Sequence, residues 1–132
     1  MRLIIGGAYQ GKRAYAMEAY GIREEEMLDG AETEPELPEL VGTGFRFKCI
    51  YNFHMFIKRL LEDGGEPLAI TEKLIVGNPE LIVIMDEVGN GIIPLEKSDR
   101  IWREQAGVIS CFLAARAESV ERIVCGLSMR IK

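Results

Sequence analysis

The sequence lacks any cysteine pattern that would define a metal site or a disulfide framework. Its three cysteines, among 132 residues, lie far apart and form no CxxC pair: Cys49, Cys111 and Cys125. This spacing excludes a zinc ribbon and a disulfide scaffold. We therefore expect a protein of a reducing compartment, the cytoplasm, in which the cysteines are small buried side chains.

Long apolar runs and an excess of basic residues are also missing. No apolar run approaches the roughly 18 residues of a membrane span, and the N-terminal run from Leu3 to Ile5 is too short for the core of a signal peptide. Lysine and arginine number 16 against 21 aspartates and glutamates, a formal net charge of −5. Because broad binding of nucleic acid needs clustered cations, we expect a soluble protein with neither a membrane span nor a nucleic-acid partner.

The composition is ordinary for a globular protein, with 48% apolar and 28% charged residues. Apolar runs alternate with amphipathic stretches, which predicts strands at 3–5, 45–51, 81–85 and 120–125, and helices at 12–20, 53–61, 67–76 and 99–118. Strands separated by helices predict an α/β fold, in which a mostly parallel sheet lies between helices in three layers. We expect one domain spanning residues 1–132, with ligands bound beyond the carboxyl ends of the strands.

An acidic stretch from Arg23 to Leu40 interrupts this alternation. It contains two prolines, Pro35 and Pro38, and eight carboxylates: Glu24, Glu25, Glu26, Asp29, Glu32, Glu34, Glu36 and Glu39. Prolines break helices, and a run of like charges is usually solvated. We predict an exposed excursion or linker at about 23–40, and we favour this reading over a specific acidic docking site.

A glycine-rich loop between the first predicted strand and the first predicted helix matches the pattern G-x-x-x-x-G-K. Its residues are Gly6, Gly7, Ala8, Tyr9, Gln10, Gly11, Lys12 and Arg13. The strand and helix on either side are the context in which this pattern binds phosphate. Glycines let backbone N–H groups surround a phosphate, and a lysine adds a mobile cation. We expect these eight residues to bind the phosphates of ATP or GTP, since no base-recognition motif distinguishes the two.

The loop departs from the usual pattern at Arg13, where a serine or threonine hydroxyl normally joins the magnesium shell. A guanidinium cannot ligate a cation. Arg13 would either donate hydrogen bonds to phosphate itself or point to solvent while water and carboxylates hold Mg²⁺. A third reading is that the loop has lost efficient catalysis.

Two adjacent carboxylates, Asp86 and Glu87, follow the apolar run at 81–85. At the end of a buried strand they suit a ligand of magnesium-bound water, for which we choose Asp86, or a base for a hydroxyl nucleophile. Only one of two adjacent residues usually faces a given side of a sheet. The alternative, weighed equally, is an acidic residue that caps the following loop.

The C-terminal half carries a longer pattern that resembles a known family. It reads D-E-V-G-N-G-I-I-P at 86–94, R-I-W-R-E-Q-A-G at 100–107 and G-L-S-M-R-I-K at 126–132. These motifs and the G-G-A-x-x-G-K opening resemble the adenosylcobinamide kinase/adenosylcobinamide-phosphate guanylyltransferase family, over about residues 1–20 and 81–132. The resemblance implies a RecA-like P-loop fold, commonly trimeric. It also implies phosphorylation of the aminopropanol hydroxyl of adenosylcobinamide, followed by GMP transfer through a histidine intermediate.

Three departures from that family bear on the second activity. Arg13 replaces the loop hydroxyl, Ser110 stands where the long helix usually has asparagine, and the segment that bears the guanylylated histidine is shortened into the acidic stretch. His54 is the only histidine, and it lies between Phe53 and Met55 on a predicted helix. We expect a packed histidine rather than a nucleophile, and hence that guanylyl transfer is lost.

The resulting prediction is a nucleotide-binding protein that phosphorylates a cobinamide-type alcohol with ATP or GTP and Mg²⁺. Its catalytic residues would be Lys12, Asp86 and Glu87, and its partners a nucleotide and a corrinoid. A homo-oligomer, by resemblance a trimer, is expected. The alternative is a catalytically degenerate module that senses or binds a nucleotide without transferring phosphate.

Overall fold

The alternation of strands and helices expected from the sequence is present in the computed structural model, which describes residues 1–34, 46–89, 91 and 95–132. The elements follow in the order β1 (Arg2–Gly6), α1 (Lys12–Tyr20), a 3₁₀ helix η1 (Glu24–Glu26), β2 (Met27–Asp29), β3 (Cys49–Tyr51), α2 (Phe53–Glu62), α3 (Pro67–Gly77), β4 (Ile82–Asp86), α4 (Lys97–Arg116), β5 (Ser119–Val124) and β6 (Leu127–Arg130). None of the helices in these ranges is long and apolar enough to cross a membrane.

The strands form one sheet in the order β2-β3-β4-β1-β5-β6. β1 pairs in parallel with both β4 and β5, and β6 pairs with β5 in the antiparallel direction. The register places Gly6 at the end of β1 opposite Asp86 at the end of β4. The predicted α/β fold with a mostly parallel sheet is confirmed, and the glycine-rich loop leaves the sheet from one of its central strands.

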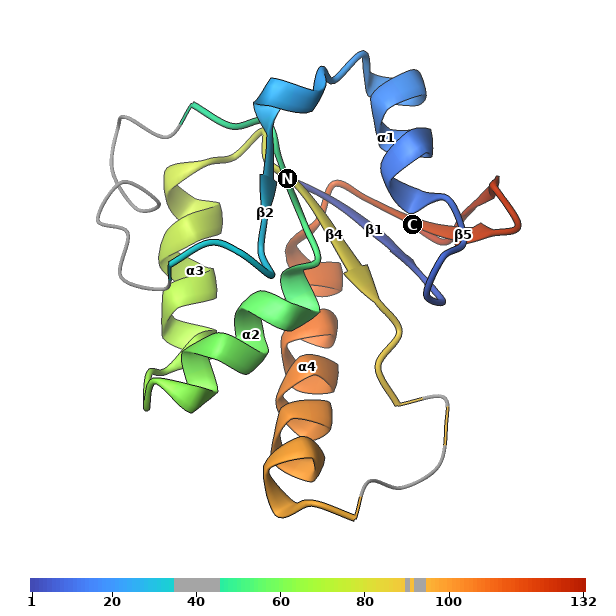
Figure 1. Cartoon of the computed structure of the whole chain (residues 1–132). Helices are drawn as coiled ribbons and strands as arrows, with labels where there is room; N and C mark the ends of the chain where they lie inside the picture. The colour runs from blue at the N-terminus through green and yellow to red at the C-terminus, as the bar shows by residue number, and fades with distance from the viewer. Residues whose placement is uncertain (35–45, 90, 92–94) are drawn as a thin grey trace.

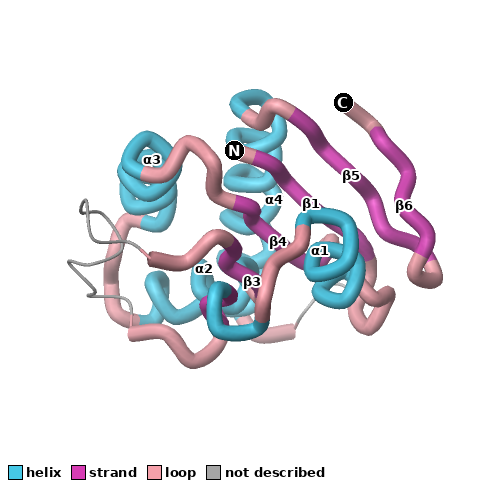
Figure 2. The backbone as a smooth tube through the Cα atoms, turned by 90° about the horizontal axis from the view of Figure 1, so that it is seen from above, coloured by secondary structure: helices cyan, strands magenta, loops and turns pink. Residues whose placement is uncertain are grey.

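Helices cover both faces of the sheet and make three layers. α1 lies on one face, and α2, α3 and α4 lie on the other (Figures 1 and 2). Neighbouring strand residues point to opposite faces, so Leu3 packs in the core under α2 to α4 and Ile4 in the core under α1. Both residues are at most 1% exposed. This burial on both faces explains why the first strand is a continuous apolar run.

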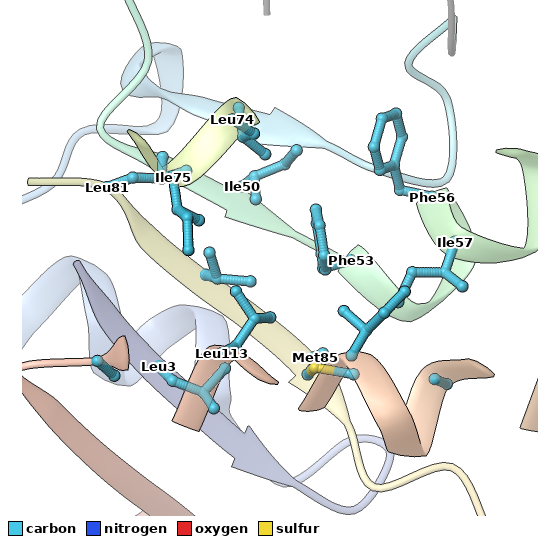
Figure 3. Packing of buried hydrophobic residues seen from close by; sticks show 14 of the residues in the cluster. Leu3, Ile50, Phe53, Phe56, Ile57, Leu74, Ile75, Leu81, Met85 and Leu113 are labelled. Carbon is cyan, nitrogen blue, oxygen red and sulfur yellow. The ribbon is translucent and has the colours of Figure 1, made fainter. Parts of the chain in front are cut away.

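α2 contributes one row of side chains to the larger core, part of which is drawn in Figure 3. Phe53, Phe56, Ile57 and Leu60 recur at helical spacing and are at most 2% exposed. Each such side chain contributes about 1.5–3 kcal/mol when fully buried. Their packing places the first turn of α2, with His54, at the carboxyl end of the sheet.

Two strands lie where the sequence predicted none. β2 falls inside the stretch expected to be an excursion, and its Met27, 7% exposed, packs under α1. It is only three residues long and follows three glutamates, so no apolar periodicity marks it. β6 follows a two-residue turn at Cys125 and Gly126, whose φ values of 50° and 78° fit a tight hairpin. Its residues are all exposed, and therefore no buried apolar run predicts it.

Other expectations need correction or lie outside the described residues. Cys49 is buried as predicted, but Cys111 and Cys125 are exposed, because one lies on the outer side of α4 and the other in the β5–β6 turn. The second strand begins at Cys49 and is shorter than predicted. Residues 35–40 of the acidic stretch, Phe45 of that strand, and residues 90 and 92–94 of the glycine loop lie outside the described ranges.

Candidate functional site

The glycine-rich loop turns sharply from the end of β1 into α1. A Cβ atom on Gly6 would lie 2.4 Å from the carbonyl oxygen of Ile123, so only glycine fits there. Gly11 adopts a left-handed conformation, with φ of 86°, directly before α1 begins at Lys12. Tyr9 also has a positive φ, 58°, and its side chain is fully exposed. The loop therefore passes sharply from the end of β1 to the N-terminus of α1, whose first N–H groups carry partial positive charge.

The β5–β6 turn holds this loop from the side. The backbone N–H of Cys125 donates to Gln10 Oε1 at 2.7 Å, and that of Gly126 donates to the Gln10 carbonyl at 2.9 Å. The positive φ values of the two turn residues direct these N–H groups toward the loop. Sequence reasoning missed this contact, because nothing local in the sequence pairs residue 10 with residues 125 and 126.

Lys12 and Asp86 meet at the base of the loop. The Lys12 side chain is 8% exposed, and its Nζ lies 2.6 Å from Asp86 Oδ1 and donates to the Gly7 carbonyl at 2.6 Å. The parallel pairing of β1 with β4 brings the two residues together, because it places the ends of both strands side by side. A cation held by a carboxylate and by the loop's own carbonyl is positioned to bind a phosphate that enters the loop.

Glu87 points elsewhere. Its carboxylate forms a two-pronged ion pair with Arg122 of β5, with Nε to Oε1 at 2.9 Å and Nη2 to Oε2 at 3.0 Å. The backbone N–H of Glu87 donates to the Gly6 carbonyl at 3.0 Å. The structure thus brings Asp86 to Lys12 and Glu87 to Arg122, as the rule that adjacent residues face different sides suggested.

Arg13 lies on the first turn of α1 and is turned toward β3. Its guanidinium forms an ion pair with Glu24 of η1 and lies 4.8 Å from the centre of the Tyr51 ring. Its Nε is buried and has no hydrogen-bond partner in the described part of the chain. Glu24 of the acidic stretch therefore lies at the site and offsets the charge of Arg13, which stands where a serine or threonine is usual.

His54 approaches Asp86 from α2. The backbone N–H of Asp86 donates to His54 Nδ1 at 3.2 Å, and Nε2 lies 3.6 Å from Asp86 Oδ2. The ring stacks on Trp102, with 6.3 Å between centroids, and is 7% exposed. Burial lowers the pKa of His54, and the Asp86 carboxylate opposes this only in part. The predicted packed histidine is confirmed, but its place beside Asp86 was missed.

A second carboxylate, Asp29 at the end of β2, forms hydrogen bonds at the end of the neighbouring strand β3. Its Oδ1 accepts from Asn52 Nδ2 and from the backbone N–H of Ala31, both at 2.9 Å. Burial first, and a hydrogen bond to Asp29 second, raise the pKa of Tyr51. Sequence reasoning missed Asp29 because it is one of many acidic residues in its stretch. The feature of the sequence that could have identified it is the pair of apolar residues, Met27 and Leu28, directly before it.

A cavity of about 860 Å³ lies between these groups. The loop from Ala8 to Arg13 lines it, together with Tyr51, Asn52 and His54 from the segment that joins β3 to α2, and Asp86. The volume is in the range of small-molecule sites. It lies beyond the carboxyl ends of β1, β3 and β4, where parallel sheets bind their ligands.

The donor set at this cavity suits magnesium that arrives with a nucleotide. The described ranges contain no cluster of three or more histidine, cysteine or acidic side chains that could hold a metal ion. Mg²⁺ in such sites usually keeps several waters and binds one or two carboxylates together with substrate phosphates. Asp86, beside the loop and partly exposed, offers one such carboxylate.

Comparison with known families gives one finding for the C-terminal half of the chain. Residues 65–131 match the family described as cobinamide kinase / cobinamide phosphate guanyltransferase. No curated protein matches the chain. The matched segment contains β4, α4, β5 and β6, and therefore Asp86 and Glu87. The glycine-rich loop and the cavity residues Tyr51, Asn52 and His54 lie outside it.

Proposed function

Since the chain belongs to the cobinamide kinase / cobinamide phosphate guanyltransferase family, we propose that it is a nucleotide-dependent kinase of cobalamin biosynthesis. Its substrate would be a cobinamide-type alcohol, phosphorylated at a hydroxyl group, and the guanylyl transfer of the family would be lost. The observation that carries the kinase proposal is the contact of Lys12 with Asp86 at the base of the glycine-rich loop.

The loop would bind the terminal phosphates of ATP or GTP. Backbone N–H groups and the N-terminus of α1 supply partial positive charge, and Lys12 supplies a full charge. Lys12 is already held in the cavity by the Gly7 carbonyl and Asp86, so little side-chain entropy is lost when phosphate replaces the carbonyl as its partner. Charge that develops on the transferred phosphoryl group would then be stabilised by groups that are in place beforehand.

Asp86 would hold Mg²⁺ that enters with the nucleotide. Mg²⁺ held there would neutralise part of the charge on the nucleotide phosphates. Asp86 also keeps Lys12 beside the loop through its Oδ1. Glu87 remains a predicted catalytic residue, but its ion pair with Arg122 supports a structural role.

The hydrogen bonding of His54 supports the loss of guanylyl transfer. The Asp86 backbone N–H points at Nδ1, so in the neutral ring the proton is on Nε2. A histidine attacks phosphorus through a free nitrogen lone pair. In His54 one lone pair accepts a backbone hydrogen bond and the other nitrogen carries the proton, so neither is poised to attack.

Arg13 favours a second candidate, a module that senses nucleotide without transferring phosphate. It occupies the position of the magnesium-binding hydroxyl, and its guanidinium pairs with Glu24. If Arg13 turned to the phosphates, it would replace part of the charge that Mg²⁺ supplies. Nucleotide binding would then be independent of magnesium.

Product formation distinguishes the two candidates. The protein is incubated with cobinamide and ATP or GTP, with and without Mg²⁺, and cobinamide phosphate is measured by mass spectrometry. The kinase proposal predicts magnesium-dependent product, reduced about 100-fold in Lys12→Ala. Binding of nucleotide without product, unaffected by Mg²⁺, would reject the kinase and support the sensing module.

A further inference from the structure

The glycine-rich loop is fastened to the rest of the protein through its oxygen atoms. The Gly6 carbonyl accepts from the backbone N–H of Glu87 at 3.0 Å, and the Gly7 carbonyl accepts from Lys12 Nζ at 2.6 Å. Two oxygens of Gln10, one in the backbone and one in the side chain, accept from the β5–β6 turn. In the described part of the chain, no backbone N–H at positions 7–11 donates to a residue outside the loop. The donors that a phosphate needs therefore stay available.

The side-chain amide of Gln10 has one orientation that satisfies its contact with the turn. The backbone nitrogen of Cys125 lies 2.7 Å from Gln10 Oε1. A backbone N–H pairs only with an acceptor, so the amide oxygen must face the turn, because the opposite orientation would bring two donors together. Gln10 also lines the cavity. Its side chain therefore connects the loop at the cavity to a fixed point on the β5–β6 turn.

The β5–β6 turn is a firm support for such a contact. Val124 pairs with Leu127, so Cys125 and Gly126 alone form the turn, and β5 is itself held between β1 and β6. The φ values of 50° and 78° are those of a tight two-residue hairpin, whose geometry is set by the two strands it joins. The loop also packs against the turn, since a Cβ atom on Gly11 would lie 3.5 Å from the Gly126 Cα. The two N–H groups of the turn therefore have defined positions.

The backbone on either side of Gln10 needs this support. Tyr9 and Gly11 both lie in the left-handed region, with φ values of 58° and 86°. This region is unfavourable for a residue with a Cβ atom, and the Tyr9 side chain is fully exposed, so its own packing does not offset the strain. The two hydrogen bonds that Gln10 accepts from the turn hold the backbone in this conformation.

We propose that Gln10 is a positioning residue: through its side-chain oxygen, the β5–β6 turn holds the glycine-rich loop in the conformation that binds phosphate. Cys125 and Gly126, neither of which lines the cavity, would thereby contribute to nucleotide affinity. Gln10 acts through the loop backbone, and its amide need not touch the ligand. This inference rests on the part of the proposed function in which the loop binds the terminal phosphates.

Two variants, their combination and one control test it. Gln10→Met removes the acceptor and keeps the length of the side chain. Gln105→Met is the matched control, the same substitution at a half-buried position of α4, on the other face of the sheet from α1. Gly126→Ala alters the contact from the turn, because a φ of 78° is unfavourable for alanine. For each protein and for the double variant of Gln10 and Gly126, calorimetry gives the Kd of ATP and of inorganic tripolyphosphate, and urea denaturation gives the midpoint of unfolding.

We expect Gln10→Met to raise the Kd of both ATP and tripolyphosphate about tenfold, the effect of one lost hydrogen bond. Its urea midpoint should match that of Gln105→Met, because the contact with Cys125 is exposed. Gly126→Ala should also raise both Kd values. The double variant should bind no more weakly than the weaker single variant, since one contact can be lost only once.

Three results would overturn the inference. A lower urea midpoint of Gln10→Met with unchanged Kd values would assign the contact to stability alone. A rise in Kd for ATP without a rise for tripolyphosphate, which has no base or sugar, would assign Gln10 to the nucleoside. Effects that multiply in the double variant would show that the turn does not act through Gln10.

The kinase proposal can fail separately, because these Kd values require no acceptor. An unaltered protein that binds ATP and tripolyphosphate but forms no cobinamide phosphate would reject the kinase, while the comparison of variants would still decide the role of Gln10. Binding of neither compound by the unaltered protein would overturn the inference together with the proposed function.

Discussion

The two adjacent carboxylates at the end of β4 should respond to very different extents when their charge is removed. Asp86→Asn and Glu87→Gln each convert the carboxylate to an amide of nearly the same shape, so that only the negative charge is removed. Asp86 faces Lys12, whose side chain is 8% exposed, and lines the cavity. Glu87 pairs with Arg122, whose side chain is 41% exposed. The same chemical change therefore acts on a buried cation in one variant and on a solvated cation in the other.

The geometry sets the size of each effect. In Asp86→Asn the ammonium of Lys12 keeps the Gly7 carbonyl but loses its ionic partner, and a hydrogen bond to a charged group contributes about 1.5–3 kcal/mol. In Glu87→Gln the lost pair is close to solvent, where such pairs contribute about 0.2–1 kcal/mol. Turnover should fall about 100-fold in Asp86→Asn, which removes the charge beside the reacting phosphate. In Glu87→Gln turnover should stay within about threefold of the unaltered protein.

Urea denaturation and the cobinamide kinase assay measure the two quantities on the same preparations. Saturating nucleotide should reduce the stability difference for Asp86→Asn, because phosphate then supplies Lys12 with an anionic partner. The reasoning is refuted if Glu87→Gln abolishes turnover while Asp86→Asn retains it. Equal losses in both would show that the pair acts as one unit.

Three further outcomes follow from the fold. Gly6→Ala should lower the free energy of unfolding by about 3 kcal/mol or more, since its Cβ would lie 2.4 Å from the Ile123 carbonyl oxygen; an unchanged urea midpoint would contradict the close approach. Burial raises the pKa of Cys49 to about 12, so mass spectrometry after iodoacetamide should show two adducts on the folded chain and three in urea; a third adduct on the folded chain would contradict this burial. Burial first and the hydrogen bond to Glu121 second raise the pKa of Tyr20 from 10 to about 12. The corresponding stability is present below pH 10 and lost as the pH rises toward 12; an equal loss in Tyr20→Phe would assign it to another group.

The sequence predicted those elements whose signal lies within one segment. The apolar runs of β1 and β4 and the helical spacing of Phe53, Phe56 and Leu60 identified the buried faces correctly. β2 was not predicted because three residues are too few to show an alternation of apolar and polar residues. Its stability comes from pairing with β3 and from packing of Met27. β6 was not predicted because an exposed edge strand has no apolar run that marks a buried face. A single domain and a trimer stay predictions.

The site residues, like the strands and helices, were predicted where the signal is local and missed where it depends on distant contacts. The loop pattern located Lys12, and the end of an apolar run located Asp86, because both signals are local. The partners of these residues come from distant parts of the chain: Gln10 meets the β5–β6 turn, and His54 meets Asp86 across the space between α2 and β4. Such contacts depend on strand order and helix packing, which spacing along the chain does not determine. Arg13 was identified as unusual, but its pairing with Glu24 could not be predicted, because it depends on how the acidic stretch folds against α1.

The measurement that tests the central claim most directly is the fate of two labels on GTP. The protein is incubated with cobinamide, Mg²⁺ and GTP that carries one label on the α-phosphate and another on the γ-phosphate. A kinase that has lost guanylyl transfer should place the γ-label on cobinamide, with neither label on the protein, and Lys12→Ala should remove the signal. The α-label bound to His54, or its appearance in the corrinoid product, would contradict the account, as would the absence of the γ-label from cobinamide with both GTP and ATP.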